Sequence, residues 1–149
     1  MQLLSRLSIS VLILFAKSKA STCYGTTSHG SLLNGIRLPL QGDNYVVYSH
    51  LGWVLGRTYV HSKVAAIILQ SYEKLMEQMP DKQFMYAETG WIAGGDFAPH
   101  KTHQNGLSVD FMVPVVNESG QSTVLPISVS NKFGYAIEFD QDGGMNHIL

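Results

Sequence analysis

The sequence predicts a small α+β fold in which one long helix packs against a small antiparallel sheet. The helix is expected at residues 62–79, because apolar residues recur there at intervals of three and four and Pro80 follows them. Short segments with the alternating or β-branched composition of strands lie at residues 45–48, 84–87, 107–113 and 132–140. A chain of 149 residues suits one compact domain.

The predicted helix has a clear apolar stripe. Ser62 is the expected N-cap, and Met76 and Met79 are interpreted as core residues. The stripe consists of Val64, Ile68, Tyr72, Leu75 and Met79. A turn at residues 117–120 is expected to open a hairpin.

Residues 1–20 have the pattern of a secretory signal. Arg6 precedes a short apolar run at residues 7–16, and small residues surround the expected cleavage site after Ala20. The run is too short for a comfortable membrane span of about 20 residues. We therefore expect a signal peptide at 1–20, a single domain at 21–149, no transmembrane segment after cleavage, and a periplasmic location. Thr22 fits a lipoprotein anchor at Cys23 badly, and the role of this single cysteine stays open.

The charge balance argues against a nucleic-acid partner. The chain has 10 basic and 11 acidic residues. The predicted signal peptide contains Arg6, Lys17 and Lys19 and no acidic residue, so its removal leaves a net charge of −4. Such a chain offers no excess of cations to displace counterions from phosphates.

Residues 94–113 contain a candidate metal site. His100, His103 and Asp110 lie close together in the sequence and carry the nitrogen and oxygen donors that zinc accepts at about 2.0–2.2 Å. Gly106 allows a tight turn that folds a loop histidine back toward the carboxylate. In the strand expected at 107–113, Asp110 points away from the apolar face, which consists of Leu107, Val109, Phe111 and Val113.

Solvated histidines and a hydrogen-bonded structural aspartate are the alternative interpretation. Burying an unpaired carboxylate among apolar residues would be costly, so the metal site is the favoured hypothesis.

The string H-x-x-H-Q-x-G-L-x-V-D, from His100 to Asp110, resembles the signature of the penicillin-insensitive murein endopeptidases. These belong with the lysostaphin-like and D-alanyl-D-alanine metallopeptidases, which share an H-x6-D element, here His103 to Asp110. Glycine-rich segments at residues 30–39 and 90–97 extend the likeness, which covers residues 28–113.

The resemblance implies a hedgehog/DD-peptidase-like zinc peptidase core. It implies that His103 and Asp110 bind zinc, that His100 is a further ligand or faces the substrate, and that Trp91 and Phe97 form walls of the cleft. The implied substrate is the peptide cross-link of peptidoglycan, cleaved at a D-alanyl bond by metal-activated water. A D-alanyl-D-alanine carboxypeptidase of the same superfamily is the alternative.

The resembled enzymes complete their zinc site with a later H-x-H element, whose first histidine assists catalysis. This sequence has no H-x-H. We expect that the domain lacks its C-terminal part and that its core is incomplete. His147 as a substitute ligand, or His100 completing the site, remain open, as does an inactive wall-binding remnant. The catalytic histidine is therefore unassigned.

Overall fold

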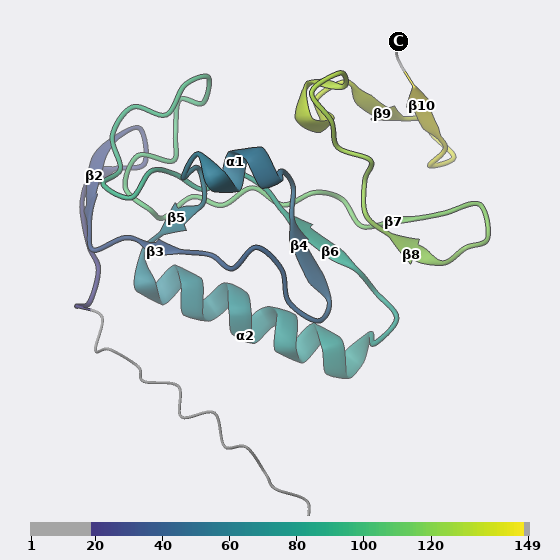
Figure 1. The fold of residues 1–149 in the computed structure, drawn as a ribbon, viewed down its shortest axis with the longest axis horizontal. Helices are drawn as coiled ribbons and strands as arrows, with labels where there is room; N and C mark the ends of the chain where they lie inside the picture. The colour runs from purple at the N-terminus through teal and green to yellow at the C-terminus, as the bar shows by residue number, and fades with distance from the viewer. Residues whose placement is uncertain (1–18, 148–149) are drawn as a thin grey trace, which may run out of the picture.

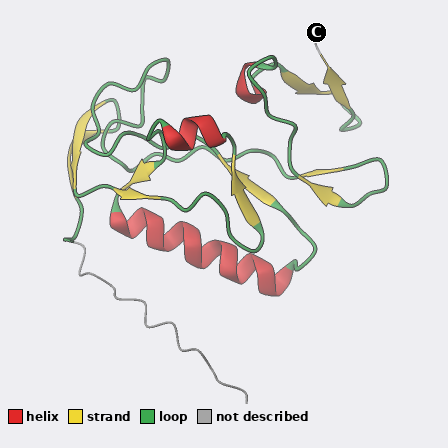
Figure 2. Cartoon of the chain, viewed as in Figure 1, coloured by secondary structure: helices red, strands yellow, loops and turns green. Residues whose placement is uncertain are grey.

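The computed structural model describes residues 19–147 and shows an α+β chain (Figures 1 and 2). Most of the predicted signal peptide lies outside these residues. The helices are α1 (His50–Val54), α2 (Ser62–Gln78) and the short 3-10 helix η1 (Lys132–Gly134). The strands are β1 (Thr22–Thr26), β2 (His29–Leu33), β3 (Ile36–Arg37), β4 (Tyr45–Val47), β5 (Tyr59–Val60), β6 (Phe84–Tyr86), β7 (Val115–Val116), β8 (Ser122–Thr123), β9 (Ile137–Phe139) and β10 (Met145–His147).

The strands pair two by two. β1 with β2, β3 with β5, β7 with β8 and β9 with β10 are antiparallel, whereas β4 and β6 are parallel. The small antiparallel sheet that the sequence predicts is therefore found only in part, because the pair β4–β6 is parallel. The reason is the connection, because α1, β5 and α2 lie between β4 and β6 and return the chain to the same end of the pair.

Helix α2 lies along one side of the central strands, and α1 lies on the other side (Figure 1). The predicted helix is confirmed nearly to its ends. Its N-cap is His61 rather than Ser62, because the His61 ring accepts a hydrogen bond from Lys63 N at 3.1 Å while Ser62 is already helical. Met79 ends the helix and is 38% exposed, so its interpretation as a core residue is wrong.

One hydrophobic core joins α2 to the strands. Ile68 and Tyr72 point inward from α2, and the Tyr72 ring stacks on Tyr45 with centroids 4.4 Å apart. Val60 and Tyr86 are completely buried. The other buried members of this core are Leu38, Val47, Tyr48, Ala65, Met85, Ala87 and Leu125.

Residues 107–113 do not form the predicted strand. The segment runs beside the end of β6, where Ala87 N donates to Asp110 O at 2.7 Å and Asp110 N donates to Glu88 O at 3.1 Å. Met112 and Val109 pack against the core, while Leu107, Phe111 and Val113 are 46%, 57% and 63% exposed. The alternation of apolar residues therefore did not predict which side chains are buried. Backbone hydrogen bonds to the edge of β6 decide which side chains face inward.

The strand predicted at 132–140 is also wrong over its first half. Lys132 and Phe133 have positive φ angles of 52° and 57°, which break the extended conformation and form η1. Only β9 remains of the expected strand. The hairpin after Pro114 is confirmed as β7 and β8, whereas the β1–β2 hairpin and α1 were not predicted.

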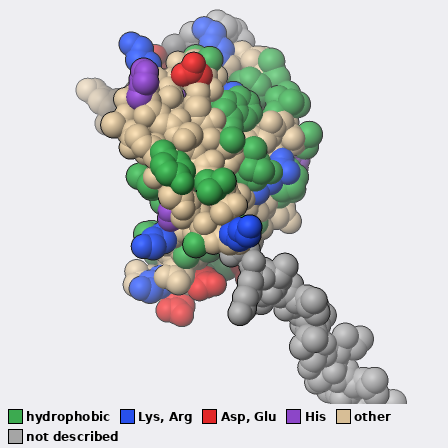
Figure 3. Space-filling model, turned by 90° about the vertical axis from the view of Figure 1, so that its left-hand side faces the viewer, with side chains coloured by type: hydrophobic (Ala, Val, Ile, Leu, Met, Phe, Trp, Pro, Cys, Tyr) green, Lys and Arg blue, Asp and Glu red, His purple; other side chains and the backbone are tan. Residues whose placement is uncertain are grey.

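Among the described residues, no helix has the length and apolar character that crossing a membrane requires. The face shown in Figure 3 carries its Lys and Arg side chains singly, spread among hydrophobic and polar ones.

Candidate metal centre

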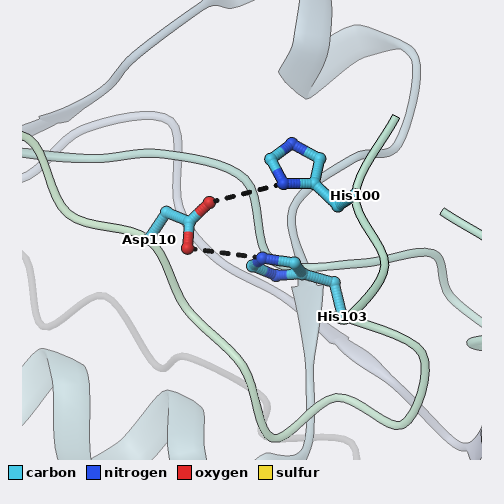
Figure 4. A group of neighbouring side chains, drawn as sticks. All are labelled: His100, His103 and Asp110. Carbon is cyan, nitrogen blue, oxygen red and sulfur yellow. Dashed lines mark ion pairs between the residues drawn. The ribbon is translucent and has the colours of Figure 1, made fainter. Parts of the chain in front are cut away.

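The long loop between β6 and β7 brings His100, His103 and Asp110 together. One possible ligand atom from each lies within 4.8 Å of the others. His103 Nε2 is 3.3 Å from Asp110 Oδ1, and His100 Nδ1 is 3.9 Å from Asp110 Oδ2 (Figure 4). The two imidazole rings meet edge to face with centroids 5.0 Å apart. The carboxylate thus faces one nitrogen of each ring.

His103 is held from behind by the backbone. Its side chain is 3% exposed, and its Nδ1 lies 3.3 Å from the carbonyl oxygen of Thr89. A carbonyl oxygen can only accept, so Nδ1 carries the proton and Nε2 presents its lone pair to Asp110. His103 has a φ of 72°. Its carbonyl oxygen lies close to Gly90, where a Cβ on residue 90 would be only 2.6 Å from that oxygen.

His100 is held through its other ring nitrogen. Its Nε2 forms a hydrogen bond with Glu88 Oε2, and the Tyr135 hydroxyl lies 3.2 Å from the same nitrogen. Since Nε2 is engaged, Nδ1 is the nitrogen that faces Asp110. The Phe97 ring packs beneath both imidazoles, with centroids 5.6 Å from His100 and 5.5 Å from His103.

Glu88 is the centre of a buried polar network that the sequence did not reveal. Besides His100, its carboxylate accepts from Tyr48 Oη at 2.7 Å and from Arg57 Nε. Burial opposes its ionisation, but the hydrogen bonds from Arg57 and Tyr48 prevail and lower the pKa of Glu88. A role for Glu88 could not be predicted from the sequence, because its hydrogen-bond partners come from the distant positions 48, 57 and 100.

The donor set fits zinc at two of its three positions as it stands. Tetrahedral ligands at about 2.0–2.1 Å from zinc lie about 3.3–3.4 Å from one another. The 3.3 Å between His103 Nε2 and Asp110 Oδ1 matches this edge, whereas the 3.9 Å between His100 Nδ1 and Asp110 Oδ2 is wider. Each imidazole also has a second hydrogen-bond partner of the kind that orients metal-binding histidines.

Of the two predicted cleft residues, Phe97 packs against both histidines and Trp91 packs against Phe97. Trp91 and Phe97 meet edge to face at 5.1 Å, and the guanidinium of Arg57 stands 4.1 Å from the Phe97 ring centroid. Phe97 is only 1% exposed, so it supports the imidazoles from behind. The role of both residues in substrate binding stays a prediction.

Two hollows open next to the site. A hollow of about 240 Å³ is lined in part by Glu88 and Asp110. A second hollow of about 540 Å³ is lined in part by Glu88 and Arg57. Apolar side chains supply most of both linings, including Leu51, Leu55, Phe111, Val129 and Phe133. They give an extended ligand room beside the three candidate metal ligands.

The alternative third ligand, His147, lies in β10, and its side chain is outside the described part of the chain. Its assignment therefore stays a prediction. Cys23 is a half-buried free thiol in β1.

The model of a family described as penicillin-insensitive murein endopeptidase matches residues 23–131. The matched segment contains His100, His103 and Asp110 together with Glu88, and it ends before Tyr135. No curated protein matches the chain.

Proposed function

Because the chain belongs to the penicillin-insensitive murein endopeptidase family, we propose that it is a zinc-dependent peptidase that cleaves D-alanyl cross-links of peptidoglycan. The resemblance seen in the sequence is thereby confirmed at the level of the family. The observation that best supports zinc is the pair His103 Nε2 and Asp110 Oδ1, 3.3 Å apart, with the other nitrogen of the ring engaged by a backbone carbonyl.

In this proposal, His103 and Asp110 hold the ion and His100 is the third ligand. Zinc bound by three protein ligands lowers the pKa of a water ligand to about 7 and polarises the carbonyl that is attacked. Thr89 orients His103 through its carbonyl. Phe97 closes the site from behind and keeps water away from the protein side of the ligands.

The test of the metal site is direct zinc binding. Isothermal titration calorimetry of the purified chain is expected to show one zinc ion per molecule. His103→Ala and Asp110→Asn are each expected to weaken binding by at least about 100-fold, because each removes a ligand. His29→Ala, which removes an exposed histidine of β2, serves as the control and is expected to bind like the parent. Equal zinc affinity in the His103→Ala variant would refute the site.

The test of the reaction uses defined muropeptides. Cross-linked dimers are expected to be cleaved into monomers, with loss of activity in the His103→Ala variant. Release of free D-alanine from uncross-linked pentapeptide, without dimer cleavage, would assign a carboxypeptidase instead.

The alternative left open above is a wall-binding protein that does not hydrolyse peptidoglycan. Cleavage of cross-linked dimers distinguishes this candidate from the peptidase. A parent protein that binds zinc and sediments with purified peptidoglycan, but leaves cross-linked dimers intact over long incubation, would support the binding protein over the enzyme.

A peptidoglycan substrate requires export, and we propose that residues 1–20 are the signal for it. Expression in a Gram-negative host, osmotic shock and N-terminal sequencing are expected to recover a periplasmic chain that begins at Ser21. A chain that keeps Met1 and stays with the cytosol would contradict the proposed location.

A further inference from the structure

The side chain of Glu88 has a position that the proposed function does not use. It extends from the end of β6 into the interior, is 11% exposed, and contacts His100 on the side opposite Asp110. Its two oxygens have different partners. Oε1 accepts from Tyr48 Oη at 2.7 Å and from Arg57 Nε, which leaves Oε2 for His100 Nε2.

The two donors on Oε1 stabilise the ionised form of Glu88, because hydrogen bonds to a carboxylate favour its charge. A guanidinium can only donate, so the atom facing Arg57 Nε must be an acceptor. An ionised carboxylate has acceptors on both oxygens, and the atom facing His100 is therefore an acceptor as well. A hydrogen bond to it requires the imidazole to carry its proton on Nε2.

We propose that Glu88 is a positioning residue that keeps the proton of the His100 imidazole on Nε2 and thereby turns the unprotonated Nδ1 toward Asp110. This inference rests on the proposed zinc site for its purpose, because a ring nitrogen binds a metal only through its lone pair. The Tyr135 hydroxyl, 3.2 Å from Nε2 and on a side chain that is 68% exposed, can both donate and accept, so it adapts to the tautomer and does not set it.

The same argument gives His103 the opposite tautomer. Its Nδ1 faces the Thr89 carbonyl at 3.3 Å and carries the proton, which leaves Nε2 for Asp110. Adjacent residues 88 and 89 thus give the two rings opposite tautomers. In each ring the unprotonated nitrogen is the one that faces Asp110, and Figure 4 shows these two nitrogens joined to the carboxylate by dashed lines.

The Glu88→Gln variant tests the assignment with little change of shape. The amide oxygen is expected to face Arg57 and Tyr48, since two donors point there, and the amide NH2 then faces His100. Because this group donates, the His100 Nε2 must accept, and the proton moves to Nδ1. The nitrogen facing Asp110 then has no lone pair to offer a metal.

The measurement is the tautomer of each histidine, read from ¹⁵N chemical shifts and two-bond ¹H–¹⁵N couplings of the imidazoles. Spectra of the metal-free protein are recorded at about pH 8, where an ordinary imidazole is neutral. In the parent, His100 is expected as the Nε2–H form and His103 as the Nδ1–H form. In Glu88→Gln, only His100 is expected to change. His100 in the Nδ1–H form in the parent overturns the proposal without any variant.

Zinc affinity gives a second measurement. Glu88→Gln is expected to bind zinc about 10–100-fold more weakly, as is usual when the partner of a metal-binding histidine is lost. Tyr135→Phe, which removes the other contact of His100 Nε2, is expected to keep the parent tautomer and affinity. A change of tautomer in Tyr135→Phe, with none in Glu88→Gln, would overturn the proposal.

The two hypotheses fail separately. If the parent binds no zinc but shows the two expected tautomers, the proposed function fails and the role of Glu88 stands. If the parent binds zinc and Glu88→Gln leaves both affinity and tautomer unchanged, only the role of Glu88 fails. Glu77→Gln, which removes the same charge from the exposed face of α2, controls for net charge.

Discussion

His103 combines a positive φ with an almost completely buried side chain, so the backbone around it must tolerate little change. Its neighbour Gln104 contributes a carbonyl that accepts from Gly95 N at 2.9 Å. Gly94 and Gly95 both have positive φ angles, of 68° and 85°. A Cβ on Gly94 would stand 2.1 Å from that carbonyl oxygen, whereas a Cβ on Gly95 would meet no atom within 4 Å.

Gly94→Ala is therefore expected to destabilise the protein considerably more than Gly95→Ala. Both variants incur the strain of an alanine at positive φ, about 1–2 kcal/mol. Only Gly94→Ala adds a collision with the backbone beside His103, and it is expected to lose at least about 1 kcal/mol more. Urea denaturation of the two variants measures this difference. Equal free energies of unfolding would show that the loop adapts.

The lowered pKa of Glu88 predicts a dependence of stability on pH. A carboxyl group with a lower pKa when folded stabilises the protein above its ordinary pKa of 4.5, and this contribution is lost as the pH falls through the lower, folded value. The free energy of unfolding of the metal-free parent is thus expected to decrease more steeply below about pH 4.5 than that of Glu88→Gln. Denaturation at several pH values measures both slopes. A steeper decrease in the variant would contradict the prediction.

At the scale of the elements, α2 is the part that the sequence predicted best. Its apolar residues recur with the helical period over more than four turns, and Pro80 marks its end, so local pattern and packing agree. The segments 107–113 and 132–140 alternate as clearly but are not decided locally. Hydrogen bonds to the edge of β6 determine the orientation of residues 107–113. Positive φ angles at Lys132 and Phe133 interrupt the extended backbone of residues 132–140.

The buried stripe of α2 gives a matched pair of variants. Ile68 is 6% exposed and Ile67 is 63% exposed, so identical substitutions remove the same atoms from the core and from the surface. Ile68→Ala is expected to cost about 2–5 kcal/mol of unfolding free energy, and Ile67→Ala to stay within about 0.5 kcal/mol of the parent. Thermal and urea denaturation measure both. Similar costs would mean that α2 does not pack as described.

For the whole molecule, the sequence predicted the α+β class and the three residues that meet at the candidate site, but not how they are held. His100, His103 and Asp110 lie within eleven residues and form a readable motif. Glu88, Tyr48 and Arg57 lie far apart in the sequence, and only the packing of β6 against its neighbours brings them together. The parallel pairing of β4 with β6 is likewise a property of the complete chain.

Zinc is expected to stabilise the complete fold by mass action, since the ligands converge only in the folded chain. At a free zinc concentration of 100 times the dissociation constant, the gain is about 2.7 kcal/mol. Differential scanning calorimetry with and without zinc is expected to show a higher Tm that EDTA reverses. The His103→Ala variant is expected to show no such gain. An equal rise in this variant would indicate zinc bound elsewhere.

Glu88 and Thr89 follow each other directly, and each fixes one of the two imidazoles. Both imidazoles are therefore anchored to two consecutive residues, and the distance between the rings depends on a single peptide unit. Inserting one residue between Glu88 and Thr89 would change the distance between these two anchors. One imidazole would then turn away from Asp110, although every histidine and carboxylate would still be present in the chain.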